Sequence, residues 1–146
     1  MSGTSGRKAR PIRSPLRGFA GIAIATLVAA GCTQAQKDYL SYSASDRPLD
    51  ASTRIARAMG QCWFAGDATF ASYIYAPELN SYSGQPRILI LPKNEPGGLP
   101  RLVVQAQEDG RGAEVKLFGP LLATEAAPRI RADIARWSAG SSACTA

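Results

Sequence analysis

The first 31 residues differ from the rest of the chain, and they limit how much of it can fold into a domain. They contain no acidic residue and five basic ones, which are Arg7, Lys8, Arg10, Arg13 and Arg17. An apolar run from Phe19 to Gly31 follows. A basic head, a short hydrophobic middle and small residues before a break are typical of a secretory signal peptide. We therefore expect residues 1–31 to be a signal peptide, which leaves residues 32–146 to fold.

A permanent membrane anchor is the main alternative for this segment. A spanning helix needs roughly 20 apolar residues, because each residue rises only about 1.5 Å across about 30 Å of hydrocarbon. The run from Phe19 to Gly31 is shorter than that and rich in alanine and glycine, so it favours a signal peptide. An uncleaved signal, or one that is cleaved without lipid attachment, remains a further alternative.

The end of the apolar run carries a more specific pattern. Its last residues are Leu27, Val28, Ala29, Ala30, Gly31 and Cys32. They resemble the lipobox of bacterial lipoprotein precursors, with Ala29 where leucine is the commonest residue. The resemblance implies that Cys32 is acylated, becomes the first residue of the mature protein and binds membrane lipid. Thr33, which stands where aspartate would retain a lipoprotein, implies the outer membrane, facing the periplasm, with the inner membrane as the alternative.

The signal peptide also accounts for the basic composition. Of the 17 Lys and Arg residues, five precede Cys32, which leaves 12 against 11 Asp and Glu. The remaining basic residues form no stripe along the sequence, so the pI of about 9.6 does not indicate a nucleic-acid-binding domain. We expect no nucleic-acid partner.

Two cysteines remain once Cys32 is assigned to lipid. In an oxidising compartment, such a pair favours a disulfide between Cys62 and Cys144. The bridge would close a loop of about 80 residues and stabilise the fold by about 4 kcal/mol in the chain-entropy model. A redox-active or metal-binding pair is the alternative, but the two residues are far apart in sequence and the chain has no histidine.

The sequence after Cys32 predicts a tether and then an α+β domain over residues 49–146. We expect residues 32–48 to be a flexible tether, although Tyr39, Leu40 and Tyr42 could instead dock onto the domain or the membrane. A first helix should begin with Asp50 as its N-cap and end near Gly66. Its apolar stripe comprises Ile55, Met59, Cys62 and Trp63, and Arg54 and Arg57 should lie on the polar face.

Strand patterns follow the first helix. Residues 70–76 are rich in aromatic side chains, residues 87–91 are apolar on both faces, and residues 102–107 and 113–118 alternate as a hairpin should. A second helix should follow Leu122, with Thr124 as its cap, and end at Gly140.

This order predicts an α+β two-layer sandwich, in which an antiparallel sheet of three to four strands is flanked by an N-terminal and a C-terminal helix. The element order loosely resembles the C-terminal domains of TolA and TonB. No motif carries that resemblance, so no functional residue is transferred from it.

The sequence offers little chemistry. With no histidine, no nucleophile elbow and no phosphate-binding loop, we expect no catalytic residue, no metal, no cofactor and no enzymatic activity. Residues 73–84 are rich in tyrosine and small polar side chains, and Tyr73, Tyr75 and Tyr82 are candidate partner-binding residues. A half-buried strand followed by an ordinary loop would give the same composition.

The functional hypothesis is therefore a lipid-anchored envelope protein with a non-enzymatic interaction or structural role. Its partner would be an envelope protein or a cell-wall polymer. A periplasmic small-ligand-binding domain is the alternative, and a hydrolase or redox enzyme would require a cleft with perturbed carboxylates or a strained disulfide.

Overall fold

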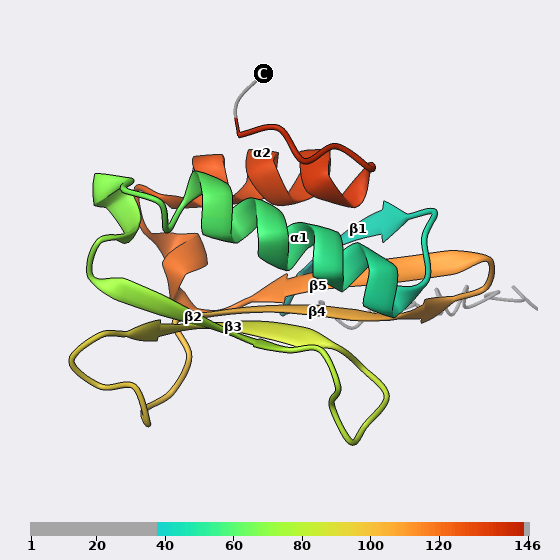
Figure 1. The fold of residues 1–146 in the computed structure, drawn as a ribbon, viewed down its shortest axis with the longest axis horizontal. Coiled ribbons are helices and arrows are strands. Elements are labelled where there is room, and N and C mark those ends of the chain that lie inside the picture. Colours follow the sequence, from blue (N-terminus) through green and yellow to red (C-terminus); the bar gives the residue numbers. More distant parts are fainter. Residues whose placement is uncertain (1–37, 145–146) are drawn as a thin grey trace, which may run out of the picture. The chain divides into compact units, whose positions relative to one another are not determined.

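The computed structural model describes residues 38–144, which form a five-stranded antiparallel sheet and two α-helices. The strands are β1 (Leu40–Ala44), β2 (Tyr73–Glu78), β3 (Arg87–Pro92), β4 (Leu102–Asp109) and β5 (Gly112–Phe118). The α-helices are α1 (Pro48–Cys62) and α2 (Ala127–Ser138), and short 3₁₀ turns span Ala68–Phe70 and Pro120–Ala123. Both α-helices lie on one face of the sheet (Figure 1), so the predicted two-layer α+β architecture is confirmed.

The sheet has five strands instead of three to four, because part of the expected tether is a strand. Its order is β1-β5-β4-β3-β2. Strand β1 pairs antiparallel with β5, and its Leu40 and Tyr42 pack against the buried core. Treating residues 32–48 as a flexible tether was therefore wrong for Leu40–Ala44. Ser41 and Ser43 give the strand a polar composition, although Leu40, Tyr42 and Ala44 alternate as inward-facing residues should.

The domain consequently begins before the expected boundary at residue 49. The Lys116 ammonium lies 4.8 Å from the centre of the Tyr39 ring, so contacts with the sheet begin at least at Tyr39. The expected signal peptide, the lipobox with Cys32 and the first residues of the tether lie outside the described residues.

The two predicted strands of the hairpin are confirmed as β4 and β5. Their buried residues alternate, and Val104 faces Leu117 while Ala106 faces Val115 in the register. These side chains point toward the helices and form the core with Ile55 and Trp63, which are fully buried. The opposite sheet face carries the half-buried polar residues of the same strands.

Both helix starts differ from the sequence prediction. Helix α1 begins at Pro48, because proline at the first helical position fits the helix and needs no amide partner. Asp50 is therefore not the N-cap; it lies in the first turn, 2.9 Å from the Arg47 guanidinium. Helix α2 begins at Ala127, and Thr124 contributes through its carbonyl, which accepts a hydrogen bond from the Ala127 amide.

Arg54 is not on the solvent face of α1. Its guanidinium pairs with Asp46 and donates a 3.0 Å hydrogen bond to the carbonyl of Trp137, near the end of α2. A cation at a helix C-terminus compensates the unsatisfied carbonyls there. Arg54 therefore joins the two helices, whereas Arg57 is exposed as expected.

Among residues 38–144, neither α-helix has the length and apolar character that crossing a lipid bilayer requires.

Candidate functional site

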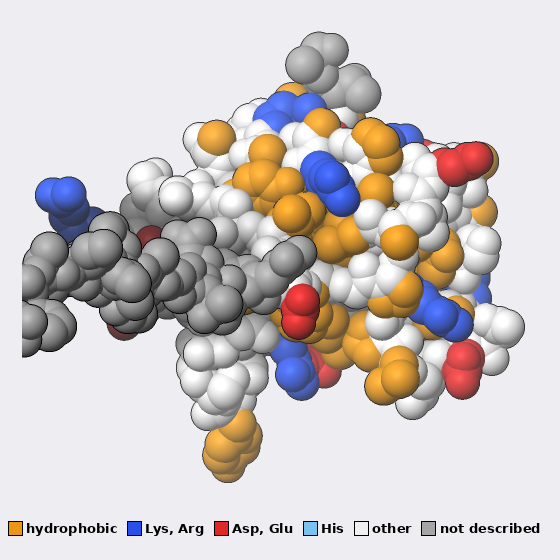
Figure 2. Space-filling view, turned by 180° about the vertical axis from the view of Figure 1, so that it is seen from behind, with side chains coloured by type: hydrophobic (Ala, Val, Ile, Leu, Met, Phe, Trp, Pro, Cys, Tyr) orange, Lys and Arg blue, Asp and Glu red, His pale blue; other side chains and the backbone are white. Residues whose placement is uncertain are grey.

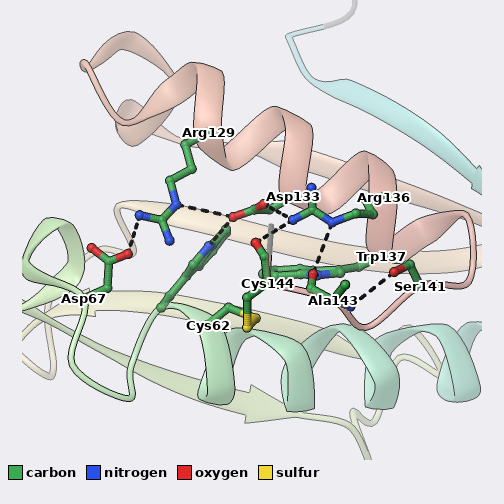
Figure 3. The surroundings of a disulfide bond; sticks show 10 residues. Cys62, Asp67, Arg129, Asp133, Arg136, Trp137, Ser141, Ala143 and Cys144 are labelled. Carbon is green, nitrogen blue, oxygen red and sulfur yellow. Dashed lines mark hydrogen bonds and ion pairs between the residues drawn. A yellow bond between two sulfur atoms is a disulfide. The ribbon is translucent and has the colours of Figure 1, made fainter. Parts of the chain in front are cut away.

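The predicted disulfide joins the end of α1 to the segment that follows α2. Cys62 and Cys144 are bonded, with their Cα atoms 5.0 Å apart (Figure 3). Arg136 donates hydrogen bonds to the carbonyls of Ala143 and Cys144, at 3.1 and 2.7 Å. The Trp137 indole also donates to Ala143, at 2.9 Å. These contacts hold the C-terminal segment against α2, so that Cys144 meets Cys62.

A buried carboxylate lies beside the bridge. Asp133 of α2 is only 3% exposed, and it accepts a 2.7 Å hydrogen bond from the indole nitrogen of Trp63. Arg136 forms an ion pair with it, and the Nε atom of Arg129 lies 3.5 Å away. Each buried charge and the buried indole donor therefore has a partner, as low-dielectric surroundings require. Asp133 therefore links α2 to Trp63 at the end of α1, and both of its carboxylate oxygens have partners.

An aromatic groove opens next to this cluster, between β2 and the segment that follows α1. We define the aromatic groove by the five aromatic side chains that line it, which are Trp63, Phe64, Phe70, Tyr73 and Tyr75. Its volume is about 460 Å³. Four of the rings form two stacked pairs, with Trp63 4.4 Å from Phe70 and Phe64 4.6 Å from Tyr75, centre to centre. A tilted contact of 5.9 Å between Phe64 and Phe70 joins the two pairs.

Gly60 allows one wall of the groove to form. A Cβ atom at this position of α1 would lie 2.5 Å from the hydroxyl oxygen of Tyr75. Glycine therefore leaves room for the Tyr75 ring to lie over the helix and stack on Phe64. Trp63 and Phe70 are buried, while Phe64, Tyr73 and Tyr75 are half-buried, so the groove presents aromatic surface to solvent.

Two charged side chains stand at the rim of the groove. Asp67 accepts a 2.9 Å hydrogen bond from the Thr69 amide and pairs with Arg129, whose guanidinium also lies 5.9 Å from the Phe70 ring centre. Lys93, in the turn after β3, is exposed and forms no ion pair within residues 38–144. Lys93 therefore gives the rim of the groove a positive charge that no acidic side chain within residues 38–144 neutralises.

The Thr69 amide, and then Arg129, lower the pKa of Asp67 from its ordinary value of 3.8. A carboxylate with a lowered pKa stabilises the folded state above the unfolded-state pKa, and this contribution is lost as the pH falls through the folded-state pKa. We expect Asp67→Asn to lower the free energy of unfolding at about pH 7 and to have a smaller effect near pH 2. Urea unfolding of both proteins at each pH measures this difference. An equal effect at both pH values would contradict the role given to the Asp67 charge.

The three tyrosines proposed as partner-binding residues do not form one surface. Tyr73 and Tyr75 line the aromatic groove, but Tyr82 lies in the β2–β3 loop, fully exposed and outside the groove. Phe64, Phe70 and Lys93 were not predicted as parts of the site. Phe64 lay near the expected end of the first helix, and Phe70 was expected to begin the strand over residues 70–76. That start was wrong, because Phe70 ends a 3₁₀ turn and β2 begins at Tyr73. No local pattern indicated that the two rings would face β2.

Comparison of the chain with protein-family models, with curated proteins and with solved structures gave no match. The resemblance to TolA and TonB domains therefore remains one of predicted element order. Within the part of the chain that the structure describes, no group of three or more Cys, Asp or Glu side chains could hold a metal ion. On the face seen in Figure 2, acidic and basic side chains are scattered among hydrophobic ones.

Proposed function

We propose that the chain is a small envelope lipoprotein, anchored through lipid on Cys32 to the outer membrane, whose periplasmic domain has a non-enzymatic interaction role. The lipobox pattern from Leu27 to Cys32 supports the anchor. The observation that carries the interaction role is the aromatic groove, because half-buried Phe64, Tyr73 and Tyr75 are the kind of side chains that dominate protein contacts. An envelope protein or a cell-wall polymer is the partner class.

A small-ligand-binding domain is the second candidate function. The groove volume of about 460 Å³ and its lining by Tyr73 and Tyr75 favour this alternative. Against it, the groove is at the edge of the sheet, and the space between sheet and helices is filled by buried side chains such as Ile55, Met59 and Trp63. A macromolecular partner suits an edge site, because such a site is open along its length.

The test is site-specific photocrosslinking in a diderm bacterial host, with a benzoylphenylalanine placed at Ala71 or, as a control, at Arg111. Both side chains are exposed, so neither change should disturb the core, but only Ala71 lies at the groove. We expect position 71 to crosslink to an envelope component and position 111 not to. We also expect Cys32→Ser to move the protein from the membrane to the soluble fraction and to weaken this crosslink.

Equal crosslinking from both positions, or none from position 71, would contradict the interaction role of the groove. A Cys32→Ser protein that stays in the membrane fraction would contradict the lipid anchor independently.

A further inference from the structure

The edge of the sheet beside the aromatic groove has unpaired backbone groups. The Lys93 amide donates a 2.9 Å hydrogen bond to the carbonyl of Ser72, and the register continues with Ile74 opposite Leu91 and Ala76 opposite Leu89. In an antiparallel pair, hydrogen-bonded and non-bonded positions alternate. The amides and carbonyls of Ile74 and Ala76 therefore face β3, whereas those of Tyr73 and Tyr75 point away from it.

No other strand in the described part of the chain pairs with that edge. Strand β2 is the last strand of the sheet, and no backbone hydrogen bond within residues 38–144 satisfies the outward groups of Tyr73 and Tyr75. Proline at position 77 removes one further outward amide, so the open edge is short. Proteins commonly block exposed edges, because a free edge is a template for another strand.

The open edge and the aromatic groove are continuous. Ile74 lines the groove, although its side chain points to the opposite sheet face from those of Tyr73 and Tyr75. The backbone of Ile74 therefore forms part of the groove wall, and the groove runs along β2. Tyr73 and Tyr75 contribute their rings to the groove and their free amides to the edge. An extended polypeptide can satisfy both, since its backbone pairs with one strand while alternate side chains point to one side.

We infer that an extended segment of another protein adds to β2 as a sixth strand and places a large apolar side chain in the aromatic groove. The unpaired Lys93 at the rim specifies an acidic group, or a carboxyl terminus, close to that side chain. This inference rests on the proposed interaction role and names its partner class.

A second copy of this chain fits the edge less well. In an antiparallel pair of β2 strands centred on Tyr75, Tyr73 would face Pro77, which has no amide to donate. Self-pairing would thus leave the Tyr73 carbonyl unsatisfied on each copy. A foreign strand without proline at that place would satisfy it.

The first part of the test selects ligands from a displayed library of random ten-residue peptides, with the full-length protein in detergent micelles as target. We expect selected peptides to share a large apolar residue and a nearby acidic residue or terminal carboxylate. Lys93→Glu should weaken their binding severalfold, and Arg111→Glu, the control at an exposed basic residue in the β4–β5 turn, should not. A library that yields no binder, or binders indifferent to Lys93→Glu, would overturn the inference.

The second part measures amide hydrogen exchange by NMR with the selected peptide. In the free protein we expect the amides of Tyr73 and Tyr75 to exchange fast and those of Ile74 and Ala76 to be protected. Saturating peptide should slow the first pair by about tenfold or more and leave the second pair unchanged. N-methylation at every second position of the peptide should abolish binding, because only alternate peptide amides pair with β2. N-methylation at the positions between them should not.

Three results would overturn strand addition. They are binding without protection of Tyr73 and Tyr75, N-methyl effects that do not alternate, and protection that arises from dimerisation without peptide. The first two would leave the groove as an interaction site, since binding itself persists. The absence of a crosslink from position 71 would instead contradict the proposed interaction role of the groove.

Discussion

Removing the disulfide is expected to lower the free energy of unfolding by about 4 kcal/mol, which is the largest effect of any change considered for this domain. The bridge joins residues that are 82 positions apart, so it restricts most of the domain in the unfolded state. For a small domain with a total stability of about 5–15 kcal/mol, this is a large fraction. Urea unfolding of the Cys62→Ala/Cys144→Ala double variant against the wild type measures the loss.

The wild type in the presence of a reductant is the control for this experiment, because it removes the bond without changing a side chain. Both proteins should lose similar stability. The C-terminal segment is also held by Arg136 and Trp137, so its local contacts should survive at low denaturant. A loss below about 1 kcal/mol in both proteins would show that the loop-closure account does not apply here.

Replacing Asp133 with alanine is expected to cost about 3 kcal/mol of folding free energy. The change leaves the buried Trp63 indole without its acceptor and removes the shared partner of Arg129 and Arg136. Breaking a buried ion pair from one side is costly, because the remaining charge stays partly desolvated. Thermal and urea unfolding of the variant provide the measurement.

Asp133→Asn is the matched control, since the amide oxygen can still accept from Trp63 while the charge is lost. We expect it to destabilise the domain less than alanine does. In a double-mutant cycle, Trp63→Phe should reduce the cost of Asp133→Ala, because phenylalanine has no donor to leave unsatisfied. Equal costs for asparagine and alanine would contradict the importance of the indole hydrogen bond.

The sequence predicted the parts of the fold that depend on local pattern. The hairpin expected from the alternation in residues 102–107 and 113–118, the apolar stripe of the first helix and the disulfide expected between Cys62 and Cys144 are confirmed. The polar composition around Leu40–Ala44 concealed β1, because an edge strand needs only one apolar face.

The candidate site depended on contacts between distant segments. Tyr73 and Tyr75 were named from composition, but the groove they line also requires Phe64 and Phe70, which a loop brings to the same edge. Asp133 was not among the predicted site residues, since its partners Trp63 and Arg129 cannot be assigned from helical periodicity. Tertiary packing alone determines which charged residues are buried and which strand edge stays open.

The lipid anchor can be tested by the intact mass of the protein purified from the membranes of a diderm bacterial host, with and without reduction and alkylation. We expect a species that begins at Cys32, carries acyl chains and gains two alkyl groups only after reduction. This result would establish the lipid anchor and the Cys62–Cys144 bond together. An unacylated mass, or one that retains residues 1–31, would contradict the lipoprotein assignment and return Cys32 to the free thiols.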